Sequence, residues 1–365
     1  MKTLNEVIDF VKKSKSQSHL CICNTNLFDE SVNAGVYGFP HSGGKYTKSF
    51  WRSVSGLYNI GPNDLVFLYR TNGDVPGCKQ IHGPFKIHCV DGHTAIYYDP
   101  KSTQFPMTVG IDSDCKARFL FETIIPEIYS IANNFELIKK YETKEIWGYR
   151  HPAVMNIGAA RKKSITSFTV KQTITILELL RDFGEVRQIL SHKLPRQKHL
   201  NFFKALKYKF NDNFIMSADV NDEAVLYSYL LQGLCNPLSA IRSTLVSDFE
   251  QINKGILNGT FASISENSML EIIVSPHLQD EMDLLLQNID DTEMLFVEVK
   301  KGEIDELTVL QTVHYIDLLQ CIFPTRKIYA NIIGSHISTG VVPQAFENRM
   351  KLVVYNKTPN GIRFN

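Results

Sequence analysis

The stretch FVEVKKGEIDELTVLQTVHY, residues 296–315, decides how the second half of the chain is interpreted. It opens with a short apolar run, which predicts a buried strand, and continues with the apolar spacing of an amphipathic helix. Side chains along a strand alternate between its two faces, so Glu298 and Lys300 share one face, whereas Val297 and Val299 share the other. Two opposite charges on one side of a buried strand favour a functional site.

Asp283 supplies a second carboxylate near this strand. It begins the preceding apolar run, DLLL, and a hairpin between the two runs would bring Asp283 and Glu298 together at neighbouring strand ends. Two such carboxylates repel each other, and a divalent cation removes the repulsion. We expect Mg²⁺, with Mn²⁺ as the alternative ion. Lys300 beside the metal would orient the attacking water or stabilise charge on a phosphate, which is the chemistry of phosphodiester hydrolysis.

Asp283, a spacing of fourteen residues and the EVK of residues 298–300 resemble the PD-(D/E)XK nuclease superfamily. Gln311 and Tyr315 match the helix that often follows in that superfamily. The resemblance covers about residues 215–355 and implies an α/β domain with a mixed sheet flanked by helices. Met282 stands where many members have proline.

The same resemblance implies roles for individual residues. The expected catalytic residues are Asp283, Glu298 and Lys300. The expected metal ligands are Asp283, Glu298 and Val299. An acidic residue on a leading helix is also expected. Glu250 is the first choice. Glu223 on an earlier helix is the alternative, and Glu271 on the expected strand over residues 269–276 is a weaker one. For the central three residues, the alternative is an ion pair on an edge strand.

Residues 1–155 are predicted to be rich in strands. Short β-prone runs alternate with clusters of Gly, Pro, Asn and Asp, and helical patterns at about residues 1–20 and 119–141 flank them. This favours a small curved sheet or barrel with a few helices. The seven cysteines contain no pair of C-x-x-C knuckles, so a structural zinc site is not expected.

The segment 49–87 resembles the PUA-like superfamily, especially EVE and YTH domains, over about residues 17–160. These domains are small barrels that hold a flipped base in an aromatic pocket, read by stacking and by hydrogen bonds to the base edge. The resemblance implies that pocket aromatics come from Tyr37, Phe39, Trp51, Phe119, Phe121 and Trp147. The alternative is that these rings are ordinary core residues.

Residues 156–212 are predicted to form a basic helical connector. Between Arg161 and Lys209 there are 12 Lys or Arg against three acidic residues. Such a surface would follow DNA phosphates, and the alternative is a solvated linker. The cations expected to contact the DNA backbone are Arg161, Lys162, Lys163, Arg196, Lys198, Lys204, Lys207 and Lys209.

The sequence therefore predicts a Mg²⁺-dependent DNA endonuclease with a base-recognition domain (1–155), the connector (156–212) and a nuclease domain (213–365). We expect a type II-like or modification-dependent restriction enzyme acting on double-stranded DNA, as a homodimer that cuts two antiparallel strands. A repair or structure-specific nuclease and a non-catalytic binder of modified nucleic acid are the alternatives. No phosphate-binding loop for ATP, signal peptide or membrane-spanning run is present in the sequence, so a cytoplasmic protein is expected.

Overall fold

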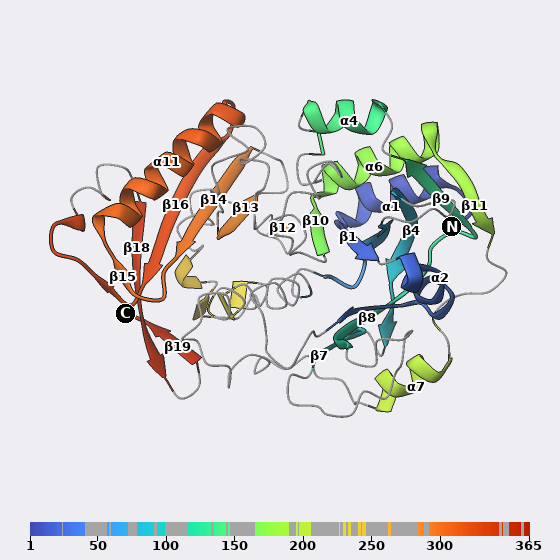
Figure 1. The fold of residues 1–365 in the computed structure, drawn as a ribbon, viewed down its shortest axis with the longest axis horizontal. Helices are drawn as coiled ribbons and strands as arrows, with labels where there is room; N and C mark the ends of the chain where they lie inside the picture. The colour runs from blue at the N-terminus through green and yellow to red at the C-terminus, as the bar shows by residue number, and fades with distance from the viewer. Residues whose placement is uncertain are drawn as a thin grey trace. The chain divides into compact units, whose positions relative to one another are not determined.

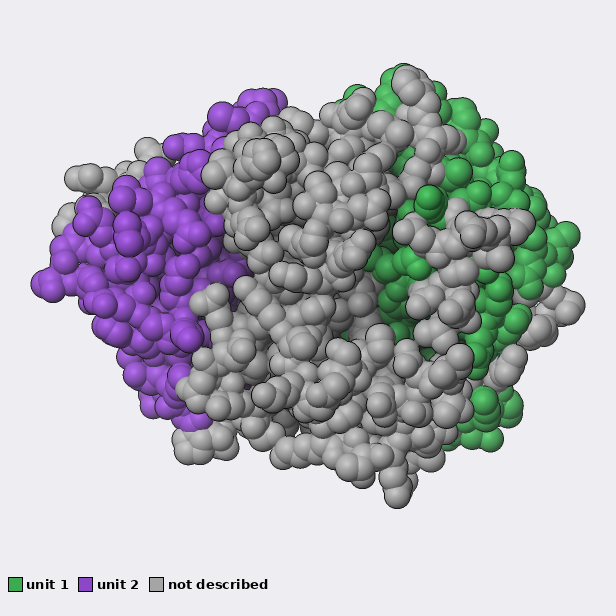
Figure 2. Space-filling model, in the orientation of Figure 1, with its two compact units in different colours: residues 1–211 green, residues 212–365 purple. Residues whose placement is uncertain are grey.

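A computed structural model of the chain describes residues 1–23, 25–40, 57, 60–71, 79–90, 93–98, 115–132, 135–143, 145–146, 165–189, 195, 197–205, 226, 229–230, 233–234, 240–241, 243–245, 262–263, 283–287, 292–342, 345, 350–358 and 361–365. The chain divides into two compact units, Met1–Asn211 and Asp212–Asn365, which Figure 2 draws in green and purple. None of the described helices has the length and apolarity needed to cross a membrane.

The first unit contains a nine-stranded sheet whose main path runs β10-β1-β3-β4-β8-β2 (Figure 1). From this path β9 pairs with β4 and β11, and β7 pairs with β8. The ladders between the described strands do not return to their starting point, so they form no closed barrel. The strands of this sheet are β1 (Ser18–Cys23), β2 (Val36–Pro40), β3 (Leu65–Arg70), β4 (Gln80–Ile87), β7 (Ile96–Tyr98), β8 (Cys115–Thr123), β9 (Glu127–Ala132), β10 (Ile165–Phe168) and β11 (Glu185–Ile189).

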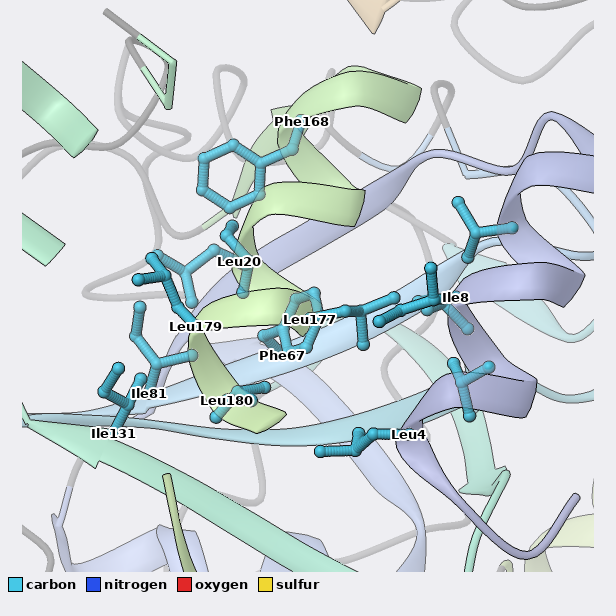
Figure 3. Packing of buried hydrophobic residues seen from close by; sticks show 14 of the residues in the cluster. Leu4, Ile8, Leu20, Phe67, Ile81, Ile131, Phe168, Leu177, Leu179 and Leu180 are labelled. Atoms are coloured by element: carbon cyan, nitrogen blue, oxygen red, sulfur yellow. The ribbon is translucent and has the colours of Figure 1, made fainter. Parts of the chain in front are cut away.

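Two helices, α1 (Leu4–Ser14) and α6 (Val170–Phe183), pack on this sheet. Their buried residues recur at helical spacing, so each helix presents one apolar stripe to the strands. Figure 3 shows Leu4 and Ile8 of α1 and Leu177 of α6 against the strands. Both β10 and α6 come from the segment expected to be a basic connector. Residues 165–189 thus supply an edge strand and a core helix to the first unit.

The helix predicted over residues 119–141 is wrong for most of its length. The chain forms β8, then β9, and only then α4 (Phe135–Glu142). Phe119, Leu120 and Phe121 are buried in succession, because both faces of β8 are covered. A continuous apolar run of this kind has no alternation to separate a strand from a buried helix. The described helices α2 (Thr25–Ala34) and α7 (Gln197–Ala205) and the hairpin of β5 (Cys89–Val90) and β6 (His93–Thr94) complete the unit.

A capping box fixes the start of α6. The Thr169 side chain accepts a hydrogen bond from the Gln172 N–H at 3.3 Å, and the Thr169 N–H donates to Gln172 Oε1 at 3.0 Å. We expect Thr169→Ala to lower the free energy of unfolding by about 1 kcal/mol, because a buried N–H at the helix start loses its acceptor. Urea denaturation measures this loss. Thr169→Ser keeps the oxygen and should unfold like wild type, and equal stability of the alanine variant would contradict the assignment.

The second unit has a six-stranded mixed sheet in the order β12-β13-β14-β16-β18-β19. Strands β14, β16 and β18 are parallel, and the other neighbours are antiparallel. Helix α11 (Glu306–Ile322) follows the sheet on one side (Figure 1). The strands are β12 (Ala262–Ser263), β13 (Leu284–Gln287), β14 (Glu293–Val299), β16 (Lys327–Gly334), β18 (Met350–Thr358) and β19 (Gly361–Phe364), beside a small pair, β15 (Glu303–Ile304) and β17 (His336–Ile337).

This arrangement confirms a mixed α/β architecture for the second unit. The expected hairpin and the helix after it are present, and two further strands, β16 and β18, follow the helix. Leu226, Leu230 and Leu234, at helical spacing, pack with the apolar face of the sheet. The expected strand over residues 269–276 lies outside the described residues. The hairpin is the part of the fold that positions the candidate site.

Candidate active site at the end of the β13–β14 hairpin

The hairpin brings Asp283 and Glu298 to opposed positions. Leu284 pairs with Val297 in the antiparallel ladder, and continuing this register by one residue sets Asp283 opposite Glu298. The alternate residues Leu284, Val297 and Val299 all belong to the core cluster on one face of the sheet. Because strand side chains alternate, Asp283, Glu298 and Lys300 share the opposite face.

Asp283 is held to the backbone of β14. Its Oδ2 accepts a hydrogen bond of 2.8 Å from the N–H of Val299, one residue beyond Glu298. This bond fixes the carboxylate beside the end of the neighbouring strand.

Glu298 is almost fully buried, with 2% of its surface exposed. Its Oε1 lies 2.6 Å from the Nζ of Lys300, which forms a charge-assisted hydrogen bond. The Lys300 N–H also donates to the Ile333 carbonyl of β16 at 2.8 Å, so the parallel neighbour fixes the backbone at this point. A buried carboxylate without such a cation would lower the stability of the fold, so Glu298 and Lys300 depend on each other as one ion pair.

Helix α11 completes the arrangement around Lys300. The lysine Nζ donates to Gln311 Oε1 at 3.2 Å, and Gln311 Nε2 donates to the Tyr315 hydroxyl at 2.9 Å. Tyr315 is buried, and its ring meets that of Phe296 edge-on at 5.3 Å. The chain of contacts thus runs from Glu298 on the strand to Tyr315 in the core, one helical turn beyond Gln311.

The start of α11 is fixed just after the site. Asp305 caps the helix and accepts hydrogen bonds from the Thr308 hydroxyl at 2.6 Å and the Thr308 N–H at 2.8 Å. These bonds, the hydroxyl first, lower the pKa of the Asp305 carboxyl from its ordinary value, and Lys300 adds a smaller attraction. The cap sets the direction in which α11 presents Gln311 to Lys300.

Gly334, at the end of β16, is a site residue that sequence reasoning missed. A Cβ at this position would lie 2.5 Å from Cγ1 of Ile304 and 2.9 Å from the Gly302 carbonyl oxygen. The Ser335 N–H donates to that same carbonyl at 2.7 Å. The turn after Lys300 therefore closes against a position that has room only for glycine. A lone glycine inside a strand pattern was the available signal.

The oxygen donors present suit a magnesium ion. Mg²⁺ is usually held by one or two carboxylates, with water and phosphate oxygens filling the remaining positions. Asp283 and Glu298 provide two carboxylates on one face of adjoining strands, and no described group of three His, Cys, Asp or Glu side chains forms a fuller cage. Glu250, Glu223 and Glu271, the candidates for a further acid, lie outside the described residues.

The described aromatics predicted to read a base are interior residues. Tyr37 is 3% exposed, and Phe119 and Phe121 are completely buried. The Tyr37 ring packs on Phe119 at 5.3 Å, and its hydroxyl donates to the Ile22 carbonyl at 2.7 Å. The three rings therefore pack in the core. Stacking of a base on them stays a prediction, and it requires that the rings become exposed. The side chains of Phe39, Trp51 and Trp147 lie outside the described part of the chain.

Two of the cations predicted to contact DNA lie on α7. Lys198 and Lys204 are both solvent-exposed there. A lysine that contacts a phosphate must be exposed, but so is a lysine that contacts only solvent. Exposure therefore does not separate the two alternatives. The remaining predicted cations lie outside the described residues: Arg161, Lys162, Lys163, Arg196, Lys207 and Lys209.

Comparisons with known proteins give limited similarity. No protein-family model and no curated protein matches the chain. A repair endonuclease from Pyrococcus abyssi is 14% identical, with a TM-score of 0.21, over 30% of this chain and 45% of that chain. A complex of EndoMS with double-stranded DNA gives 11% identity and a TM-score of 0.21, over 30% of this chain and 42% of that one. The chain spans less than half the length of either structure. At these TM-scores we infer neither the fold nor the activity of this chain from them.

Proposed function

We propose that the chain is a metal-dependent DNA endonuclease whose active centre is formed by Asp283, Glu298 and Lys300. The observation that supports this proposal is the Lys300 ammonium at 2.6 Å from the buried Glu298 carboxylate, on the face shared with Asp283. An ion pair with a purely structural role needs neither a second carboxylate at the opposed position nor a glutamine that orients the lysine. The site has both.

Each residue has a separate task in this proposal. Asp283 and Glu298 would hold Mg²⁺, together with the carbonyl of Val299, and the metal would supply Lewis-acid activation of a water and of the phosphate. Lys300 would orient the attacking water or stabilise negative charge on the phosphate. Gln311, tied to Tyr315, limits the positions that the lysine ammonium can adopt.

The finer assignment is a restriction-type enzyme with base recognition in residues 1–155. It rests on the sequence resemblance to EVE and YTH domains, and on the logic that a homodimer cuts both strands. Digestion of modified and unmodified duplex DNA of known sequence, with and without Mg²⁺, tests it. Discrete bands support restriction. A smear, or nicking at DNA structures, would instead indicate a repair nuclease, and no cleavage would leave a non-catalytic binder.

The basic segment provides a salt-dependent prediction. Replacing Lys204, Lys207 and Lys209 together by Gln should reduce the slope of log affinity against log salt by up to about 3, because each lost phosphate contact removes about 0.9 from the slope. Cognate and random duplexes should weaken alike. Fluorescence anisotropy over a salt series measures the slope. The matched triple change to Arg keeps the charge and should keep the slope. An unchanged slope in the Gln variant would show that these lysines are only solvated.

A further inference from the structure

Strand β11 (Glu185–Ile189) is an open edge of the first unit. All of its residues are exposed, and among the described strands it pairs with β9 alone (Figure 1). Its second edge therefore presents backbone N–H and C=O groups to solvent. Large apolar side chains accompany it: Phe183 is 50% exposed, Val186 49% and Ile189 70%. An exposed edge with this apolar content is suited to pairing with another strand.

The sequence of this edge is complementary to itself. An antiparallel pairing of two β11 strands about a twofold axis at Val186 sets Glu185 of each copy opposite Arg187 of the other. Val186 then meets its own copy on the axis. Cross-strand apolar pairs and opposite charges each stabilise a sheet. Because the axis is twofold, each favourable pair away from it occurs twice.

The two charges already occupy suitable positions in one chain. Arg187 Nη2 lies 3.0 Å from Glu185 Oε2, and Arg187 Nε donates to Ser130 Oγ at 2.8 Å. Both side chains therefore lie on the same side of the strand. A second copy in the register above would extend this pair to an array of four alternating charges, with less side-chain entropy lost because Ser130 already orients the arginine.

We propose that two copies of the chain associate through β11 in this register. The match of Glu185 to Arg187 under the twofold operation, in both pairs at once, favours a second copy over an unrelated strand. A bulge at Arg187 interrupts the regular ladder with β9 and twists the edge. The backbone pairing across the axis is therefore short, and the small interface makes a concentration-dependent dimer. This inference is independent of the nuclease proposal.

Charge reversals test the register with the full chain. Glu185→Arg alone would oppose Arg to Arg, and Arg187→Glu alone would oppose Glu to Glu. Each variant should dimerise about tenfold or more weakly than wild type in sedimentation velocity over a concentration series. Mixing the two variants restores opposite charges in both pairs, so the mixture should associate as wild type does. Changes within a single chain cannot produce this recovery.

Two further measurements make the outcome decisive. Val342→Glu removes an exposed apolar residue of the second unit (56% exposed) and should leave self-association unchanged. In the wild-type chain, amide hydrogen exchange at residues 185–189 should slow as protein concentration rises. A wild-type chain that remains monomeric with concentration-independent exchange would overturn the proposal. Self-association of both single variants at wild-type strength, or a mixture that does not recover, would overturn it as well.

Discussion

Replacing Glu298 by Gln is expected to lower the rate of DNA cleavage by about 10³-fold or more while leaving DNA affinity close to wild type. The substitution keeps the side-chain volume and an oxygen for the Lys300 ammonium, but it removes the charge that a metal ligand needs. Asp283→Asn should do the same, because the amide oxygen still accepts from the Val299 N–H. Affinity should persist, since it comes mainly from phosphate contacts elsewhere.

The matched control lies on the same strand. Glu293 is also a buried glutamate of β14, but it lies at the other end and faces Lys327 at 3.8 Å. Burial raises the pKa of its carboxyl, so its ionisation lowers stability as pH rises above the ordinary glutamate range. Glu293→Gln should therefore be as stable as wild type or more so at neutral pH, and should cleave normally. Single-turnover cleavage of a duplex compares the variants, and activity in both Glu298→Gln and Asp283→Asn would sink the proposed active centre.

The second half of the fold was predictable because its signals are local. The alternation of charged and apolar residues in β14 indicated which side chains share a face, and the antiparallel pairing of β13 with β14 then determined their neighbours across the ladder. The spacing of Gln311 and Tyr315 on one helical face likewise placed both on the same side of α11. Period and register were enough here because β13 and β14 are neighbours in sequence, and because the helical spacing is set within α11 itself.

The first half depends on distant pairings that no local pattern encodes. Strand β1 pairs in parallel with β3 and antiparallel with β10, well over a hundred residues later. Helix α6 was predicted as part of a basic connector, because charged residues dominate the composition of that segment. Its apolar side nevertheless packs into the core of the first unit. The rings of Tyr37, Phe119 and Phe121 show the same limit, since aromatic identity alone does not separate a pocket from an interior.

Lys300→Ala is expected to abolish cleavage and to destabilise the chain when no metal is present. The alanine leaves the buried Glu298 carboxylate without an ammonium 2.6 Å away, which costs about 1–3 kcal/mol of unfolding free energy. Mg²⁺ should offset this loss, because a cation at the site replaces the missing positive charge. Thermal unfolding should therefore show a larger Mg²⁺-dependent rise in Tm for Lys300→Ala than for wild type, where the ammonium and the metal repel each other.

Lys301→Ala makes the same change of charge one residue away. Lys301 is exposed, and its backbone carbonyl, which accepts from the Tyr355 hydroxyl at 3.0 Å, is unaffected by the substitution. It should keep wild-type cleavage and the wild-type response of Tm to Mg²⁺. Calorimetric titration then separates the roles of the lysine and the carboxylates: Lys300→Ala should bind Mg²⁺ at least as tightly as wild type, whereas Glu298→Gln should bind it weakly. Complete loss of Mg²⁺ binding in Lys300→Ala would show that the lysine positions the metal ligands themselves, and that the proposed division of tasks is wrong.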